Sequence, residues 1–157
     1  METNTNWTKS VTGVVIRDGK VLLARHTYGA GAGKLIIPGG YIQNGETPEH
    51  AAAREILEET GITAQPVGVI GIRFNMHDWY IAFRAEYVSG EARSDGDENS
   101  EVVWLETGEA LSRDDVPDLS KKLIAAALSG SEMPLTKFAS GEKWAPQSLY
   151  CFNGKEN

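Results

Sequence analysis

The sequence predicts an α/β fold in which one sheet carries helices on both faces. Three observations support this class. Apolar segments with the pattern of β-strands stand before and after a segment rich in helix-forming residues, a second helical segment follows towards the C-terminal end, and turn-forming residues separate them. A sheet with one helix inside its strand order and another after it needs a helix layer on each face. The length of 157 residues and the 41% hydrophobic content fit one domain.

The first predicted elements form a hairpin. Residues 11–17 and 21–26 have the pattern of strands, and the Asp-Gly dipeptide between them is a strong signal for a two-residue turn. A short apolar run at residues 35–37 predicts another strand, which the following Pro-Gly-Gly sequence ends.

The glycine-rich stretch at residues 29–34 superficially suggests a phosphate-binding loop. A Walker loop needs glycine five residues before its Gly-Lys pair, where this chain has Tyr28, and Ser or Thr after the lysine, where it has Leu35. Lys34 stands where the dinucleotide fingerprint needs its third glycine. We therefore expect a flexible loop between two strands.

A helix is predicted over residues 48–60. Thr47 is a good N-cap, Pro48 fits the first helical position, and Gly61 supplies a left-handed stop. At about 100° per residue, an apolar side and an acidic arc separate on this helix. The side expected to pack on the sheet holds Ala52, Ala53, Ile56 and Leu57, and the adjoining arc holds Glu55, Glu58 and Glu59.

The second half of the chain supplies the remaining strands and the second helix layer. We expect strands at residues 67–74, 79–88 and 101–105, an acidic loop at 89–100, a short helical turn at 107–112 and a helix at 118–129. In the last helix, Leu119, Leu123 and Ala127 form the apolar stripe, and Gly130 ends it.

The three glutamates of the helix at 48–60 are the first candidates for chemistry. Like charges at offsets of three and four repel one another and destabilise an isolated helix. Clustered carboxylate oxygens suit Mg²⁺, or Mn²⁺ as a substitute, and a bound cation would remove the repulsion. Gly39, through its carbonyl, and Glu46 stand before the helix, where they could reach the same ions. The competing interpretation is a solvated acidic helix face.

A fixed order of residues favours the metal site over that alternative. From Gly40 the chain has five residues, Glu46, seven residues and then Arg-Glu-Ile-Leu-Glu-Glu-Thr-Gly-Ile, which ends at Ile62. This order matches the Nudix box, and the chain thus resembles the Nudix hydrolases. The resemblance implies an α/β/α sandwich with a mixed sheet. It also implies a single Nudix domain over residues 1–157, with a core at about 8–130 and a C-terminal tail at 131–157 whose role is open.

The same resemblance implies a Mg²⁺-dependent pyrophosphohydrolase. Water would attack one phosphorus and break the P–O–P bridge of a nucleoside diphosphate linked to another moiety, as in a nucleotide sugar, ADP-ribose or a dinucleoside polyphosphate. Two alternatives stay open. One is a housecleaning enzyme that acts on nucleoside triphosphates, and the other is a nucleotide-sensing module without turnover.

Family subtypes differ at roughly sixteen to eighteen places past the box, where this chain has Asp78, Trp79 and Tyr80. The proline associated with ADP-ribose enzymes is absent there, and the tyrosine is similar to the dinucleoside-polyphosphate pattern. This single aromatic residue leaves the substrate open.

The box residues take their expected roles from the resemblance. Glu55 and Glu59 are the leading metal ligands, with Glu46 and Gly39 beside them. Glu58 is a ligand or the general base. Arg54 is expected to pair with a box glutamate and to fix its orientation.

Outside the box, Glu101 shares the general-base candidacy with Glu58. Glu101 stands three residues before Trp104, and many Nudix enzymes carry a ligand or base in such a Glu-x-x-Trp setting. The competing interpretation is a solvated carboxylate at a strand end. Asp97 and Glu98 are the nearby substitutes if Glu101 points away.

Three residues are candidates for substrate binding. Arg25 and Arg73 end predicted strands and could clamp a phosphate, although an exposed arginine is the competing interpretation for each. Tyr80 could stack on a base, and its alternative is a half-buried aromatic residue of the core.

Charge and composition bound the partners. Fifteen basic against 22 acidic residues give a net charge of −7, which argues against a surface for nucleic acid that depends on phosphate neutralisation. One cysteine excludes an internal disulfide, and no apolar stretch has the length of a signal core or a membrane span. We therefore expect a cytoplasmic protein with a small nucleotide as partner, no membrane and no nucleic acid. Exchange of the tail between two copies would give a homodimer.

Overall fold

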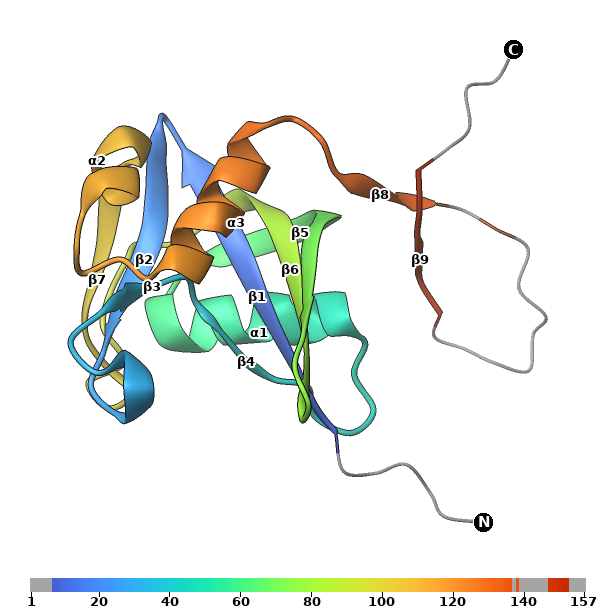
Figure 1. Cartoon of the computed structure of the whole chain (residues 1–157), viewed down its shortest axis with the longest axis horizontal. Coiled ribbons are helices and arrows are strands. Elements are labelled where there is room, and N and C mark those ends of the chain that lie inside the picture. Colours follow the sequence, from blue (N-terminus) through green and yellow to red (C-terminus); the bar gives the residue numbers. More distant parts are fainter. Residues whose placement is uncertain (1–6, 137, 139–146, 153–157) are drawn as a thin grey trace.

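The computed structural model describes residues 7–136, 138 and 147–152 of the chain (Figure 1). Its helices are α1 (Pro48–Thr60), α2 (Thr107–Ser112) and α3 (Asp118–Leu128), with a 3-10 turn at Gly29–Gly31. Its strands are β1 (Thr8–Arg17), β2 (Lys20–His26), β3 (Leu35–Ile36), β4 (Gly39–Tyr41), β5 (Thr63–Phe74), β6 (Asp78–Ser89), β7 (Asn99–Glu106), β8 (Met133–Thr136) and β9 (Leu149–Tyr150).

The strands form one mixed sheet, which confirms the predicted fold class. Its order is β3-β2-β1-β6-β5-β8-β9, with β4 paired to β1 and β7 paired to β2. β1 and β6 run parallel, and the other pairs are antiparallel. β1 pairs with β2 only at its end, through Ile16 and Arg17, whereas further back along the strand it pairs with β4. Along this edge β1 therefore changes its partner from β4 to β2.

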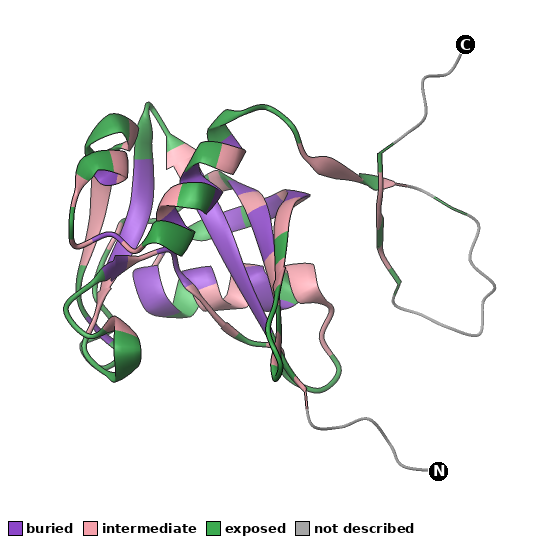
Figure 2. Ribbon diagram, in the orientation of Figure 1, coloured by how far each residue is buried: buried purple, intermediate pink, exposed green. Residues whose placement is uncertain are grey.

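Helices cover both faces of the sheet, and Figure 2 shows buried residues concentrated along the central strands. On one face, Ile56 of α1 packs with residues of β1, β2 and β6. On the other face, Leu123 and Ile124 of α3 pack with Ala110 of α2 and with residues of β1 and β2. The box helix α1 thus covers one face of the sheet, and α2 and α3 cover the other.

The strand β4 contains Gly39 and Gly40, which the sequence analysis expected only to end the preceding strand. Glycine is what allows this pairing, because a Cβ at Gly39 would collide with the carbonyl oxygen of Val11 on β1. The turn that was expected to end a strand instead brings two glycines against β1, directly before the box helix.

The box helix has the predicted bounds but is rotated from the predicted orientation. Leu57, expected on the sheet side, is 47% exposed, and Glu59 is instead buried with Ala52 and Ile56. These three positions are four and three residues apart and form one stripe. In α3, Leu119 is likewise exposed, and Ile124 joins Leu123 and Ala127 in the core.

The described parts of the C-terminal tail pack on the domain. β8 extends the sheet beside β5, and β9 pairs with β8. The ring of Tyr150 meets Phe83 edge to face at 5.5 Å between centroids, and Ser148 Oγ donates to a carboxylate oxygen of Glu49 at 3.1 Å. Residues 137, 139–146 and 153–157 of the tail lie outside the described residues. Among the described helices, none is long and apolar enough to cross a membrane.

Candidate active site

The side chain of Arg54 gathers the carboxylates of the box. Its Nη2 and Nε donate to Glu46 at 2.6 and 3.0 Å, and its Nη1 donates to Glu55 at 2.9 Å and to Glu58 at 3.1 Å. Nη2 also donates to the carbonyl of Tyr41 on β4 at 3.0 Å. The hydrogen bond from Arg54 lowers the pKa of the Glu46 carboxyl. One guanidinium therefore orients three carboxylates and ties them to β4.

Glu59 is the most deeply buried carboxylate of the box. It is 4% exposed, and its Oε2 is buried without a hydrogen-bond partner among the described residues. Burial and, after it, the nearby charges of Glu55, Glu98 and Asp95 together raise the pKa of Glu59 to about 8, against the opposing effect of a backbone hydrogen bond from Gly39. A buried carboxylate that has one oxygen without a partner and lies among like charges is costly without a cation.

Glu55 lies beside Gly40 and faces the same region. Its carboxylate fills the space that a side chain at position 40 would need, since a Cβ there would lie 2.5 Å from Oε1. Burial raises the pKa of Glu55, although Arg54 acts in the opposite direction, and Glu58 and Glu98 add to the rise. Glu58 differs from its neighbours because its side chain is 58% exposed.

The loop between β6 and β7 brings further acidic residues to the box. The charges of Glu98 and Asp95 act on Glu59, and that of Glu98 also acts on Glu55. Thr27 holds this loop at the end of β2, with its Oγ1 donating to the carbonyl of Asp97 at 2.8 Å and its backbone N–H donating to that of Glu98 at 3.1 Å.

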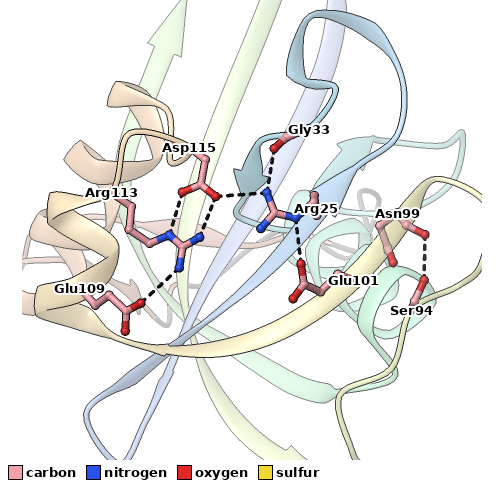
Figure 3. Close-up of polar contacts among 8 residues, drawn as sticks. All are labelled: Arg25, Gly33, Ser94, Asn99, Glu101, Glu109, Arg113 and Asp115. Carbon is pink, nitrogen blue, oxygen red and sulfur yellow. Dashed lines mark hydrogen bonds and ion pairs between the residues drawn. The ribbon is translucent and has the colours of Figure 1, made fainter.

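Glu101 is not among these residues. Figure 3 shows its carboxylate directed at Arg25, whose Nε donates to it at 2.8 Å. Alternation along β7 explains this placement, because Val103 and Leu105 pack towards α2 and α3, whereas Val102 and Trp104 pack towards Ile56 of α1. Glu101 is two residues from Val103 and therefore points to the same sheet face, which is the face opposite the box helix.

Arg25, predicted to clamp a phosphate or else to be an exposed arginine, is half-buried and bound by other groups of the protein. Besides Glu101, its Nη1 donates to the Gly33 carbonyl at 2.8 Å and to Asp115 at 3.1 Å (Figure 3). Arg113 binds the same Asp115 carboxylate at 2.7 and 2.8 Å. Hydrogen bonds from these two arginines hold the pKa of Asp115 well below its ordinary value. Arg25 thus joins the glycine-rich loop to the α2–α3 connection.

A cleft of about 480 Å³ opens beside β4. Arg73 and Tyr80, both predicted to bind substrate, line it together, and the Arg73 guanidinium lies 5.0 Å from the centroid of the Tyr80 ring. Arg73 also pairs with Asp78 at 2.6 Å. The other lining residues are Ser10, His26, Ala30, Ile36, Ile37, Gly39, Gly40, Tyr41 and Asp78 itself. The glycines place this cleft next to the box.

A second hollow of about 470 Å³ is lined by Trp7, Lys9, Phe74 and Trp79. Its lining contains no residue of the Nudix box and no carboxylate. The cleft beside β4, by contrast, is lined by Gly40 of the box and by the neighbouring Gly39, so it can present a bound molecule to Glu55 and Glu59 of α1.

The carboxylates fit a divalent cation chemically, although their present arrangement is not a closed ligand shell. Among the described residues, no three His, Cys, Asp or Glu side chains already surround a common point. The Oε2 of Glu59 is nevertheless a buried oxygen donor without a partner in the described part of the chain, and Glu55, whose carboxylate pairs with Arg54 at 2.9 Å, acts on it from nearby. Hard oxygen donors of this kind suit Mg²⁺ or Mn²⁺.

Sequence reasoning missed Asp95, Asn99 and Tyr28 as members of this region. Asn99 is buried against the end of α1, and its side chain donates to the Glu59 carbonyl at 2.7 Å. Tyr28 is 56% exposed, and partial burial of its hydroxyl, together with the charges of Glu98, Glu59 and Glu55, raises its pKa. No motif marks these positions. The chain after β2, which carries Tyr28, and the loop between β6 and β7, which carries Asp95 and leads to Asn99, bring them to the box.

Comparison with known proteins establishes the family. The NUDIX domain model matches residues 7–127, so the chain belongs to the Nudix family. It is 44% identical over 90 residues to an oxidized purine nucleoside triphosphate hydrolase from Danio rerio, covering 52% of this chain and 57% of that protein. It is 30% identical over 103 residues to an ADP-ribose pyrophosphatase from Methanocaldococcus jannaschii, covering 62% and 60%. The match thus spans less than two thirds of either relative.

Solved structures agree with the fold. A NUDIX hydrolase from Nitrosomonas europaea superposes with a TM-score of 0.74 at 24% identity, covering 85% of this chain and 97% of that one. At this identity the likeness concerns the architecture of the sandwich.

Proposed function

We propose that this protein is a Mg²⁺-dependent pyrophosphohydrolase that cleaves the P–O–P linkage of a nucleoside diphosphate joined to another moiety. One observation carries the proposal: Glu59 is a buried carboxylate with an unpartnered oxygen, next to Glu55 and beside a cleft. The names of the two relatives, a triphosphate hydrolase and a pyrophosphatase, support hydrolysis of phosphoanhydrides by this family.

Glu55 and Glu59 would hold the cation, with Glu46, Glu58 and the Gly39 carbonyl as further donors. When bound, the cation would neutralise phosphoryl oxygens and acidify water. Arg54 would keep Glu46 and Glu55 in fixed orientations through its hydrogen bonds, because a planar guanidinium holds carboxylates at defined angles.

A carboxylate on this side of the sheet would accept the proton of the attacking water. Glu98 is our candidate, since its charge acts on both Glu55 and Glu59, whereas Glu101 is engaged by Arg25 on the opposite face. Glu58 remains the alternative base, although its carboxylate already accepts from Arg54 at 3.1 Å.

The cleft beside β4 would bind the nucleotide. Tyr80 offers an aromatic ring for a base, and Arg73 offers a cation for a phosphate or a base edge. Arg73 would have to share its charge with Asp78, to which it is bound at 2.6 Å.

A substrate panel tests the proposal. The panel contains ADP-ribose, a nucleotide sugar, a dinucleoside polyphosphate, nucleoside triphosphates and an RNA with a dinucleotide cap, each with millimolar Mg²⁺ and with excess chelator. We expect turnover of at least one diphosphate-linked compound, with products identified by mass, and its loss with chelator. The Glu59→Gln protein from the same preparation controls for contaminating phosphatases. Undiminished hydrolysis in chelator would contradict the mechanism.

A second candidate function is hydrolysis of free or oxidised nucleoside triphosphates. It is favoured by the 44% identity to the relative named for oxidized purine nucleoside triphosphates. Exclusive turnover of triphosphates in the panel would select it. Folded, Mg²⁺-loaded protein that turns over nothing would instead select a nucleotide-sensing module. The cytoplasmic location, the homodimer and the lack of a nucleic-acid partner stay predictions.

A further inference from the structure

The acidic loop between β6 and β7 is tied at both of its ends to the last turn of α1. The backbone N–H of Arg93 donates to the Thr60 carbonyl at 2.9 Å, and Asn99 Nδ2 donates to the Glu59 carbonyl at 2.7 Å. The last carbonyls of a helix lack partners within the helix. The loop therefore supplies two of these partners, one from its backbone and one from the side chain of Asn99.

Asn99 is also bonded to the middle of this loop. Its backbone N–H donates to Asp95 Oδ1 at 3.0 Å, and its carbonyl accepts from Ser94 Oγ at 2.8 Å, which Figure 3 shows. The residue is 2% exposed, and its Oδ1 is buried without a hydrogen-bond partner in the described part of the chain. Burying such an oxygen costs roughly 1–3 kcal/mol, so fold stability alone gives little reason for an amide here.

The position of the loop matters because of Glu98. This residue directly precedes Asn99, and its carbonyl accepts from the backbone N–H of Thr27 at 3.1 Å. The loop is thus held between α1 on one side and the end of β2 on the other. Asn99 binds the backbone carbonyl of Glu59, and the charge of Glu98 acts on the side-chain carboxyl of the same residue.

We propose that Asn99 is a positioning residue that fixes the acidic loop against α1 and so places Glu98 at the box carboxylates. The inference rests on the proposed function, in which Glu98 accepts the proton of water. Asn99 acts through its amide donor: Nδ2 binds the backbone of the box helix, and the direct attachment of Glu98 to Asn99 passes this constraint on to the base.

Asn99→Asp tests the role of the donor. The substitution keeps the volume but replaces Nδ2 by an oxygen that faces the Glu59 carbonyl. We expect kcat to fall roughly 10- to 100-fold, as for other groups that orient active-site residues, with KM within about threefold. The matched control is Asn75→Asp, where Oδ1 accepts from the His77 N–H and the new carboxylate can do the same. Equal kcat in the two variants would overturn the proposal.

A double-mutant cycle separates positioning from general destabilisation. If Asn99 acts through Glu98, the Asn99→Asp change should have little further effect on kcat once Glu98→Gln is present. Fully additive losses in kcat would overturn the proposal, because they would mean that the two residues act independently.

Amide hydrogen exchange provides a readout without catalysis. In chelator, Asn99→Asp should speed exchange of the Thr27 amide, which is bound to the Glu98 carbonyl, and leave that of Leu23 in the core of β2 unchanged. Unchanged exchange at Thr27 would overturn the proposal even if wild-type protein proved inactive. Should Asn99→Asp fail to fold, Thr27→Val removes the hydroxyl that binds the loop from the other side. We expect the same loss of kcat at constant KM, and an unaltered kcat would contradict the inference.

Discussion

Arg25 and Glu101 face each other across β2 and β7, and their side chains are joined at 2.8 Å on the sheet face covered by α2 and α3. Arg25 is fixed further by Asp115 and by the Gly33 carbonyl (Figure 3). Glu101 therefore has a structural partner, and its carboxylate points away from the helix that carries Glu55 and Glu59.

This relationship separates two candidates for the general base. We expect Glu101→Gln to keep kcat within a few-fold of wild type. Glu98→Gln should lower kcat roughly 10²- to 10⁴-fold with nearly unchanged nucleotide binding, the usual contribution of a general base. Steady-state kinetics on the best substrate of the panel decide between them. The reverse result, a large loss only in Glu101→Gln, would return the role to Glu101.

The box itself is tested by Glu59→Gln. The substitution keeps the side-chain volume but removes the charge from the proposed metal ligand, so kcat should fall by orders of magnitude. Without metal, the variant should be at least as stable as wild type, because glutamine is neutral at every pH, whereas the buried Glu59 must either take up a proton on folding or carry a charge near Glu55. Thermal unfolding in chelator measures this. A near-normal kcat would contradict the assignment of the box carboxylates more severely than any other result.

The raised pKa of Glu59 predicts how the stability of the metal-free protein depends on pH. Its pKa is about 8 in the folded protein, against an ordinary value of 4.5. Between these values the folded state binds a proton that the unfolded state has lost, so the free energy of unfolding should fall as pH rises through this window. Below this pH window Glu59 is protonated in both the folded and the unfolded state, so it does not make the free energy of unfolding depend on pH.

Denaturant unfolding in chelator at several pH values checks this dependence, with Glu59→Gln as the comparison. The difference in free energy of unfolding between the variant and wild type should grow from pH 5 to pH 8. A constant difference would mean that Glu59 ionises normally. Mg²⁺ should stabilise wild type more at pH 8 than at pH 5, since a cation binds the ionised carboxylate.

Local sequence signals predicted the elements and the box, because capping, turn and periodic residues act over a few positions. Thr47 and Gly61 do flank α1 as expected, and the residue order from Gly40 to Ile62 identified the family. The predicted sheet-facing side of α1 was wrong at Leu57, which is exposed, while Glu59 is buried in the structure. Which of these two residues faces the sheet depends on packing partners far along the chain.

The features that the sequence did not predict depend on contacts between residues far apart in the chain. Which face of the sheet Glu101 takes depends on the pairing of β7 with β2, and a shift of one residue would reverse it. The contact of Asn99 with Glu59 likewise depends on the return of a loop to a helix end. Neither leaves a local pattern in the sequence.

Arg54 provides the last prediction, because its role depends on shape as well as charge. Its guanidinium donates to Glu46 through two nitrogens and to Glu55 and Glu58 through a third. Lysine keeps the charge but offers a single ammonium in place of this planar fork. In Arg54→Lys, Glu46 and Glu55 could no longer be oriented together, so we expect kcat to fall about 10- to 100-fold.

The control for this variant is Arg113→Lys, which removes a fork that binds Asp115 and Glu109 on the opposite face of the sheet. Both variants lose a multidentate arginine, and comparable decreases in Tm are therefore expected from each. Only Arg54→Lys should also lower kcat and weaken Mn²⁺ binding, measured by titration calorimetry. Similar kinetic losses in both variants would show that Arg54 stabilises the fold and does not position the carboxylates of the box.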